Sequence, residues 1–235
     1  MKQVHTQVAT DPETLRISID TKAKVKIGDF SRDGEARGAE AVQALDHDMH
    51  PTAVLAPAGI LEVDTRQLNV VFGTSRDTSD FVADCLDLWW ANRKDQHVGV
   101  RRLLINLDNG PEIASSRTQF MKRMVDFSDQ HQLTLELAYY PPYHSKYNPI
   151  ERCWGILENH WNGTLLSSVA KAIAWAKTMT WKGLAPIVHL LNRVYPIGVR
   201  INRSDFKPVA ARLDRSKSLP KWSLLIKPKP LNPDR

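Results

Sequence analysis

The stretch that most constrains this chain runs from residue 139 to residue 161 and reads YYPPYHSKYNPIERCWGILENHW. Its beginning is typical of a strand end, which two consecutive prolines interrupt. Asn148 and Pro149 then predict the start of a helix, because Asn is a good N-cap and Pro is tolerated at the first helical position. Apolar residues follow at spacings of three and four, so one helix face is expected to be buried. They are Ile150, Trp154, Leu157 and Trp161.

Glu151 lies in the first turn of this expected helix, beside the apolar face. The positive end of the helix dipole stabilises a charged carboxylate there, and a carboxylate must be charged to bind a metal ion. A structural interpretation stands beside this one, since many first-turn glutamates only complement the dipole. Which of the two applies depends on the other acidic residues that the fold brings close to Glu151.

Two aspartates end expected strands. Asp20 follows the alternating pattern RISI, typical of a half-buried strand, and Asp108 follows the apolar run RRLLINL, which predicts a buried central strand. A turn cluster begins directly after Asp108, so its carboxylate is expected where the chain leaves the sheet, as in many α/β binding sites. Asp20, Asp108 and Glu151 are therefore candidate ligands of Mg²⁺ or Mn²⁺, and a pair of such ions supports phosphodiester chemistry.

The rest of the chain alternates between strand and helix patterns, which predicts an α/β fold. Strands are expected at residues 16–20, 24–30, 59–63, 68–72, 103–108 and 133–140. Helices are expected at residues 74–94, 115–130, 165–180 and, as a short last piece, 185–195. The first two strands predict an antiparallel hairpin, and the later alternation predicts a parallel core with right-handed crossovers.

Composition divides the chain unevenly. Residues 1–14 form a polar leader, residues 15–198 one domain with an irregular insertion at about residues 31–58, and residues 199–235 a basic, Pro-rich tail. From residue 200 onward ten Lys and Arg stand against three Asp, a balance of +7 that leaves the rest of this +6 chain near −1. Such a tail is typical of phosphate contact, although a solvated tail that only aids solubility fits the same charges.

The composition also excludes several classes of protein. The sequence contains no run of about 18 apolar residues, so no membrane span is expected. The N-terminus has no apolar signal region. Only two cysteines occur, Cys85 and Cys153, without a metal-binding or disulfide pattern. These features predict a protein of the reducing cytoplasm, with no membrane partner.

Two further clusters are ambiguous. Asp46, His47 and Asp48 stand close enough in sequence to bind a metal ion, although short exposed clusters of this kind usually bind nothing tightly. The adjacent Trp89 and Trp90 favour core packing over base stacking.

The segment PPYHSKYNPIERCWGILENHW resembles the third-acid motif of DDE-type transposases, the broad group that includes mariner-like elements. With ISIDTKAKVKIGDF, LLINLDNGPE, the Asp-His-Asp cluster and MTWKG, the chain is similar to bacterial insertion-sequence transposases of the ISAzo type. The similarity runs from about residue 11 to about residue 221, nearly the whole chain. It implies a ribonuclease-H-like mixed sheet flanked by helices, with the basic segment as a C-terminal extension.

The resemblance implies that Asp20, Asp108 and Glu151 are the catalytic acids and the ligands of two Mg²⁺ or Mn²⁺ ions. The second and third acids are 151 − 108 = 43 positions apart, which is longer than is typical of mariner-like enzymes. DNA is the implied partner, at element ends and target, and the active form is expected to be a homo-oligomer. Our candidate DNA-contacting residues are Lys22, Asn109, His144, Lys146, Asn148 and Arg152.

Two functions are therefore predicted as alternatives. The first is metal-dependent DNA strand cleavage and strand transfer. The second is an inactive remnant or an accessory fragment that binds DNA or oligomerises, because the helix-turn-helix region of such transposases has no room in the nineteen residues before Asp20. A plain ribonuclease-H-like nuclease is a third possibility, which the NPIE helix disfavours. We expect the chain to be the catalytic domain alone.

Overall fold

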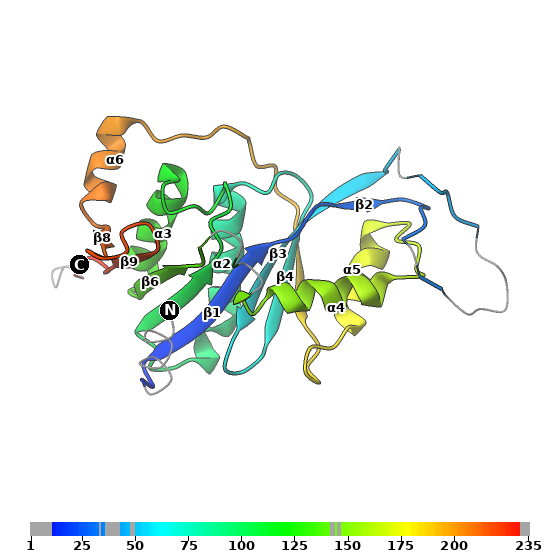
Figure 1. Ribbon diagram of the computed structural model, residues 1–235, viewed down its shortest axis with the longest axis horizontal. Helices are drawn as coiled ribbons and strands as arrows, with labels where there is room; N and C mark the ends of the chain where they lie inside the picture. The colour runs from blue at the N-terminus through cyan, green and yellow to red at the C-terminus, as the bar shows by residue number, and fades with distance from the viewer. Residues whose placement is uncertain are drawn as a thin grey trace.

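The computed structural model describes residues 11–32, 34–35, 43–47, 50–141, 144 and 147–230. A nine-stranded sheet runs through the molecule, with helices on both faces (Figure 1). The strands are β1 Thr14–Thr21, β2 Val25–Ile27, β3 Ala53–Glu62, β4 Leu68–Gly73, β5 Arg102–Leu107, β6 Thr134–Tyr139, β7 Ile187–Leu191, β8 Asp214–Arg215 and β9 Ser223–Ile226. The helices are α2 Ser79–Arg93, the 3-10 helix η1 Lys94–Gln96, α3 Thr118–His131, α4 Glu151–Trp161, α5 Val169–Thr178 and α6 Arg203–Ala210.

The sheet order is β7-β4-β3-β1-β5-β6-β9-β8, with β2 paired to β3. At its centre β1 pairs antiparallel with β3 and parallel with β5, and β6 continues the parallel part beside β5. This mixed sheet of antiparallel and parallel strands flanked by helices confirms the predicted ribonuclease-H-like α/β class. None of the helices among the described residues has the length and apolar character needed to cross a membrane.

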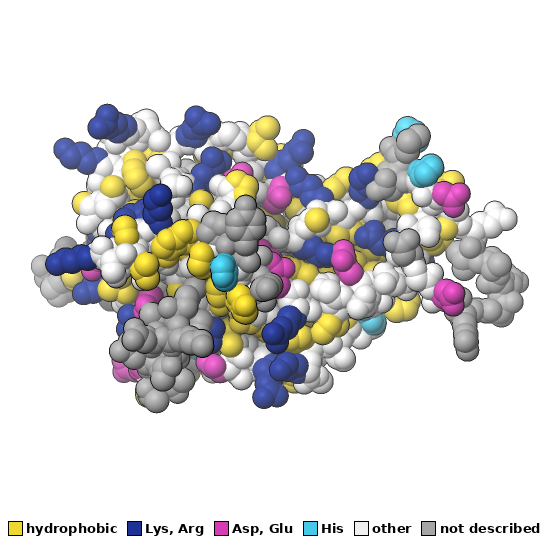
Figure 2. Space-filling view, viewed as in Figure 1, with side chains coloured by type: hydrophobic (Ala, Val, Ile, Leu, Met, Phe, Trp, Pro, Cys, Tyr) yellow, Lys and Arg dark blue, Asp and Glu magenta, His cyan; other side chains and the backbone are white. Residues whose placement is uncertain are grey.

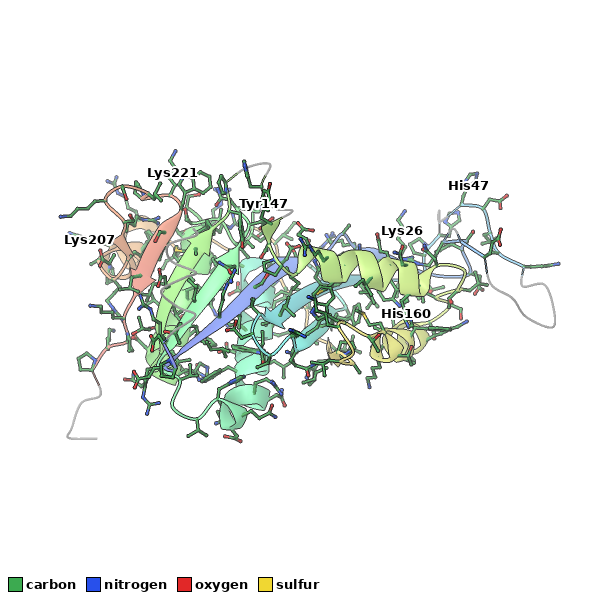
Figure 3. All side chains as sticks on the ribbon, turned by 60° about the horizontal axis from the view of Figure 1, so that its bottom comes forward. Lys26, His47, Tyr147, His160, Lys207 and Lys221 are labelled. Atoms are coloured by element: carbon green, nitrogen blue, oxygen red, sulfur yellow. The ribbon has the colours of Figure 1, made fainter. Side chains whose placement is uncertain are left out.

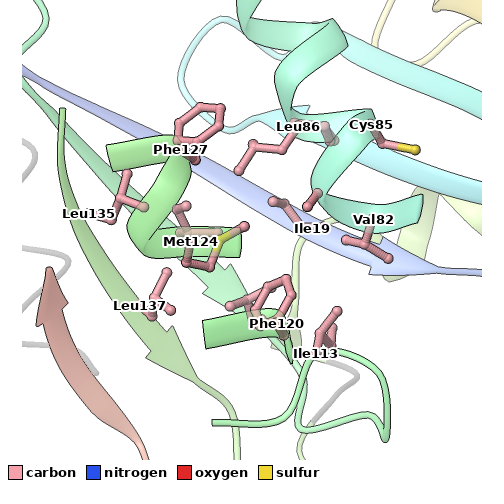
Figure 4. Packing of buried hydrophobic residues seen from close by; sticks show 14 of the residues in the cluster. Ile19, Val82, Cys85, Leu86, Ile113, Phe120, Met124, Phe127, Leu135 and Leu137 are labelled. Atoms are coloured by element: carbon pink, nitrogen blue, oxygen red, sulfur yellow. The ribbon is translucent and has the colours of Figure 1, made fainter. Parts of the chain in front are cut away.

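Strand alternation divides the interior into two cores, one on each face of the sheet. Ile17 and Ile19 of β1 point into the core under α2 and α3, and Figure 4 shows Ile19 close to Leu86 of α2 and Met124 of α3. The intervening Ser18 and Asp20 face the other way, toward the core under α4 and α5. The predicted apolar face of α4 is buried there, as expected. Its members are Ile150, Trp154, Leu157 and Trp161.

The predicted hairpin at the start of the chain is wrong. β2 does not fold back on β1; both strands pair antiparallel with β3, Thr21 opposite Ala58 and Val25 opposite Leu55. They are one interrupted strand, and the long β3 begins inside the region that was expected to be an irregular insertion. Pro57 of β3 lies opposite the interruption, which follows because proline has no N–H to donate to a neighbouring strand.

Residues 185–195 were expected to be helical, but residues 187–191 form β7, a strand parallel to β4. Short apolar runs do not distinguish a helix from a strand by periodicity alone, and the run was too short for its length to decide. Nearby, Trp181 and Leu184 exchange two backbone hydrogen bonds of 2.8 and 2.9 Å across a tight turn. Gly183, with a φ angle of 86°, belongs to this turn.

The C-terminal segment is not a separate tail within the described residues. α6 packs near α3, and β9 completes the sheet by pairing antiparallel with β6 from Leu135 opposite Ile226 to Ala138 opposite Ser223. The buried Leu224 and Ile226 alternate with the partly buried Ser223 and Leu225, a strand pattern only four residues long. The boundary expected at residue 198 therefore cuts through the folded unit, although this segment carries most of the excess positive charge.

Candidate active site

Asp20 lies near the end of β1, with only 6% of its surface exposed. The indole Nε1 of Trp154 in α4 donates a hydrogen bond of 2.9 Å to Oδ2, and the backbone N–H of Thr21 donates one of 2.8 Å to Oδ1. Neither donor carries a charge. Among the described residues, the carboxylate is therefore held in place by uncharged donors and forms no ion pair.

The electrostatics at Asp20 reveal its acidic neighbours. Burial, followed by repulsion from Asp108 and then from Glu151, raises the pKa of Asp20 to about 7. The two hydrogen bonds to its oxygens oppose this rise but do not cancel it. Three acidic side chains that are far apart in sequence are thus close enough in space for their charges to interact.

Asp108 follows β5 and occupies the position that corresponds to Asp20 on the neighbouring strand. Ile19 is opposite Leu107 in the parallel register of β1 and β5, so each aspartate is the next residue along its strand. The backbone N–H of Gly110 donates a hydrogen bond of 3.0 Å to Oδ1 of Asp108, which ties the side chain to the turn after the strand. Both carboxylates therefore lie at the same edge of the sheet.

Glu151 is brought to this edge by a buried polar contact between α4 and β1. Ser18 donates a hydrogen bond of 2.5 Å to the amide oxygen of Asn148, and the amide nitrogen donates one of 3.2 Å to the carbonyl of Ile19. The N–H of Ile150 in turn donates to the hydroxyl of Ser18 at 3.2 Å. The start of α4 is thereby fixed to β1 within two residues of Asp20.

Asn148 has a different role from the two that were predicted for it. Its side chain does not cap α4, whose capping position is Ile150, and its DNA contact is not possible in this structure because the residue has 0% exposed surface. Instead, its amide satisfies buried polar groups of β1, which leaves Glu151 at the first residue of the helix.

Gly59 permits the close approach of α4 to the sheet. It lies opposite Asp20 in the β1–β3 register. A Cβ atom at this position would come within 2.6 Å of Ile150 Cδ1 and 2.7 Å of the Trp154 ring. A larger residue here would push back the two side chains that flank Glu151, one of which binds Asp20.

The three acids suit a hard divalent cation, because such ions prefer oxygen ligands and the acids offer six carboxylate oxygens. Repulsion between the three carboxylates also favours a bound positive charge. Within the part of the chain that the structure describes, however, no three Asp, Glu, His or Cys side chains are grouped tightly enough to hold a metal ion. The acids are electrostatically coupled without forming a ready coordination cluster, so binding an ion requires them to move closer together.

The other predicted DNA-contacting residues are in different environments. Lys22 is ion-paired with Glu158 at 2.6 Å, Asn109 is exposed beside Asp108, and His144 is exposed with its ring stacked on Tyr147 at 5.8 Å between centroids. Arg152 is exposed on α4 next to Glu151. Lys146 lies outside the described residues, and these contacts with DNA stay predictions.

The two ambiguous clusters have separate outcomes. Trp89 and Trp90 are buried, with 1% and 6% exposed surface, which agrees with core packing. Asp46 and His47 are exposed, and Asp48 lies outside the described residues. Among the described residues, Asp46 and His47 belong to no group of acidic, His or Cys side chains that could hold a metal ion.

The folded C-terminal hairpin adjoins the same edge of the sheet. The hydroxyl of Ser115, in the loop after Asp108, donates a hydrogen bond of 2.9 Å to the carbonyl of Lys221, and Tyr139 donates from its N–H to Trp222 at 2.8 Å. In the view of Figure 3, Lys221 and Tyr147 lie along this one edge. The backbone of the C-terminal segment therefore contacts the loop that follows Asp108.

Sequence reasoning missed Trp154 and Gly59 as parts of the site. Trp154 was assigned only to the apolar face of α4, although its indole N–H needs a partner when buried, which was a usable signal. Gly59 offered no signal, because its role depends on a helix that begins some ninety residues later in the sequence.

The sequence matches the family model described as Rhodopirellula transposase DDE domain over residues 1–228. No match was found among the curated proteins. Among solved structures, the chain is similar to one in the cryo-EM structure of the simian T-cell lymphotropic virus intasome in complex with PP2A regulatory subunit B56 gamma. That likeness has a sequence identity of 16% and a TM-score of 0.38, and it covers 63% of this chain and 39% of that chain.

Proposed function

The chain belongs to the family of Rhodopirellula transposase DDE domains, and we propose that it cuts and joins DNA strands by metal-dependent phosphodiester chemistry. One observation carries this proposal. Two strand-end aspartates and a helix-start glutamate, up to 131 residues apart in sequence (151 − 20), interact electrostatically on one face of the sheet. Burying an acid beside two other acids destabilises its charged form, which supports a functional role for Asp20.

In the proposed reaction, a water oxygen attacks the phosphorus of a DNA phosphodiester. The bond from phosphorus to the 3′ oxygen breaks, and the leaving 3′ oxygen takes up a proton as the water loses one. In strand transfer, the freed 3′-hydroxyl oxygen attacks a phosphorus of a target strand and loses its proton to solvent, while the 3′ oxygen of that strand leaves and takes up a proton from solvent. No protein side chain becomes covalently bonded.

Asp20, Asp108 and Glu151 would hold the metal ions. When bound, two Mg²⁺ or Mn²⁺ ions increase the nucleophilicity of the attacking oxygen and neutralise the charge on the leaving oxygen. The protein's own contribution is positioning. Trp154 and the Thr21 N–H orient the carboxylate of Asp20, Gly110 orients that of Asp108, and the contact of Asn148 with β1 fixes the start of α4.

The proposal is tested by nicking of a supercoiled plasmid by the full chain with Mn²⁺. We expect nicking by the wild type, none after chelation, and a loss of at least about a hundredfold in Asp108→Asn, since charge stabilisation at the leaving oxygen is then reduced. Lys94→Gln, on the opposite face of the sheet, is the control and should nick normally. Undiminished nicking by a folded Asp108→Asn variant would refute the proposed site.

A wild-type chain that binds DNA without nicking it would support the alternative function, an inactive or accessory DNA-binding fragment. Circular dichroism of each variant separates loss of chemistry from loss of fold. The set of variants therefore decides between a catalytic domain and a fragment that only binds DNA.

A further inference from the structure

A cavity of about 240 Å³ lies beside the start of α4, on the side of the sheet that carries Asp20. We call it the basic groove. Its cationic side chains are Arg66, Arg152 and Lys182, its aromatic walls are Tyr147 and Trp181, and Leu61 of β3 lies at its base. Figure 2 shows Lys and Arg side chains gathered at the lower edge of the molecule, where the β3–β4 turn lies in Figure 1.

The three cations come from three separate parts of the chain: the β3–β4 turn, the first turn of α4 and the turn after α5. Among the described residues no carboxylate forms an ion pair with any of them, whereas Lys22 and Lys24 are paired with Glu158 and Asp77 at 2.6 and 2.9 Å. The ammonium group of Lys182 lies over the Trp181 ring, 5.5 Å from its centroid. The groove thus gathers three cationic side chains that form no ion pair among the described residues.

The backbone gives a second, independent indication. Arg66 and Lys182 have φ angles of 65° and 48°, in the left-handed region that favours glycine. Only one other described non-glycine residue, Gln132, has a positive φ. Long cationic side chains therefore occupy two turn positions where glycine would be less strained, and both residues line the same groove. Strain of this kind is characteristic of functional sites.

The groove adjoins the acidic residues. Arg152 directly follows Glu151, and Leu61 lies opposite Ser18 in the β1–β3 register, two residues before Asp20. A strand with its scissile phosphodiester at the acids would have further phosphates on either side of it. A strand that leaves the acids past the start of α4 meets the three cations next.

We propose that the basic groove binds backbone phosphates of the DNA strand next to the scissile phosphodiester, with the exposed Tyr147 contacting a sugar or base. The proposal rests on the proposed function, because it assigns a substrate position beside that site. Phosphate contacts of this kind set the position of DNA without reading its sequence. Each contact also releases counterions, which makes binding depend on salt.

The test is a fluorescence-anisotropy titration of a labelled DNA duplex with the full chain at several salt concentrations. The double variant Arg66→Gly and Lys182→Gly should bind about tenfold more weakly per lost contact near 0.1 M salt, and its salt slope should fall by about 2. Its melting temperature should stay equal or rise, because glycine relieves both left-handed positions. Arg152→Gln, on ordinary helical backbone, should lower the slope by about 1.

Two controls separate the relief of backbone strain from the loss of positive charge. Gln132→Gly relieves the remaining left-handed position, near the C-terminal end of α3, and should leave DNA binding unchanged. Lys94→Gln removes a positive charge from η1 and should not change the salt slope to the same extent.

Unchanged DNA affinity and salt slope in the double variant and in Arg152→Gln would refute the proposal that the basic groove binds DNA. Failure of the wild-type chain to bind duplex DNA at low salt would also refute it. Nicking separates this outcome from the proposed function. Wild-type nicking with an unaffected double variant keeps the function and removes the groove. Weakened binding of the variants in a chain that never nicks keeps the groove and removes the function.

Discussion

Asp20 and Glu62 are two buried carboxylates on neighbouring strands, and their surroundings are opposite. Glu62 has 0% exposed surface and is surrounded by donors: Arg93 at 2.7 and 3.0 Å, Thr65 at 2.8 Å, Trp89 at 3.1 Å and His97 at 3.2 Å. Asp20 receives one indole and one backbone N–H, and its charged neighbours are two further acids. The first carboxylate is ion-paired with Arg93, whereas the second forms no ion pair with any residue that the structure describes.

The difference appears in the two pKa values. Burial raises the pKa of Glu62, but hydrogen bonds from Arg93, Thr65 and Trp89 outweigh it and hold the pKa below its ordinary value. Burial and two acidic neighbours raise the pKa of Asp20 to about 7. A carboxylate that stabilises the fold is surrounded by its counter-charges, whereas one that is kept for an external cation lacks them. The comparison therefore assigns Glu62 to stability and supports the role proposed for Asp20 as a ligand of a metal ion.

The largest expected effect is at Glu62. Glu62→Ala leaves the buried Arg93 guanidinium without its carboxylate, with Gln96 as its remaining side-chain partner, so we expect the free energy of unfolding to fall by about 3–5 kcal/mol at pH 7. Urea unfolding measures it. Because the folded pKa of Glu62 is lowered, its stabilisation is present above the unfolded pKa near 4.5 and is lost as pH falls through the folded value. A loss below about 1 kcal/mol at pH 7 would contradict the assignment.

Asp20→Asn should act in the opposite direction. The unfolded carboxyl loses its proton near pH 4 and the folded one near pH 7, so wild-type stability falls as pH rises between these values and is lowest above pH 7. The rise in pKa from 3.8 to about 7 is equivalent to ~4 kcal/mol, and one lost acceptor offsets roughly 1 kcal/mol of the gain.

We therefore expect Asp20→Asn to be more stable than the wild type by about 3 kcal/mol at pH 8, and not more stable at pH 4. Urea unfolding across this pH range measures the difference. Glu62→Gln is the comparison, since it should be destabilising at pH 8. An Asp20→Asn variant that is less stable at every pH would show that the carboxylate supports the fold.

The sequence predicted the part of the fold that depends on local patterns. Alternation in β1 and the apolar run of β5 placed Asp20 and Asp108 at strand ends, and the apolar spacing after Pro149 placed Glu151 at a helix start. The prediction that the three acids form one site came from the resemblance to DDE-type transposases. Strand patterns alone do not specify which strand ends lie close together.

The errors arose where pairing is non-local. β2 was assigned to a hairpin because it follows β1, yet both strands pair with β3, about thirty residues later, and Pro57 made β3 look irregular. β9 reaches the sheet through only four residues. Asn148 looked like a helix cap because its actual partner, Ser18, is 130 residues away in sequence.

Asn148 holds the start of α4, and with it Glu151, against the strand that carries Asp20. Asn148→Ala removes its hydrogen bonds with Ser18 and the Ile19 carbonyl, and we expect a loss of about 1–3 kcal/mol in unfolding free energy. A start of α4 that is no longer fixed to β1 also moves Glu151, which lowers the pKa of Asp20 by reducing repulsion. Asn159→Ala, exposed on the same helix, should change neither quantity. An unaltered Asp20 titration in a destabilised Asn148→Ala variant would show that Asn148 does not position Glu151.

The smallest expected effect is stabilisation of the folded chain by Mn²⁺ itself. A cation bound by Asp20, Asp108 and Glu151 would reduce the repulsion among these three acids, a repulsion that is absent around Glu62. Free Mn²⁺ at ten times its dissociation constant should therefore stabilise the fold by about 1.4 kcal/mol. Thermal unfolding with and without Mn²⁺ measures this shift without requiring any activity. Asp20→Asn should lose most of it, whereas Asp214→Asn, an exposed acid on β8, should keep it. Equal shifts in both variants would mean that Mn²⁺ binds elsewhere, and Asp20 would then be an unbalanced charge with no ligand to explain it.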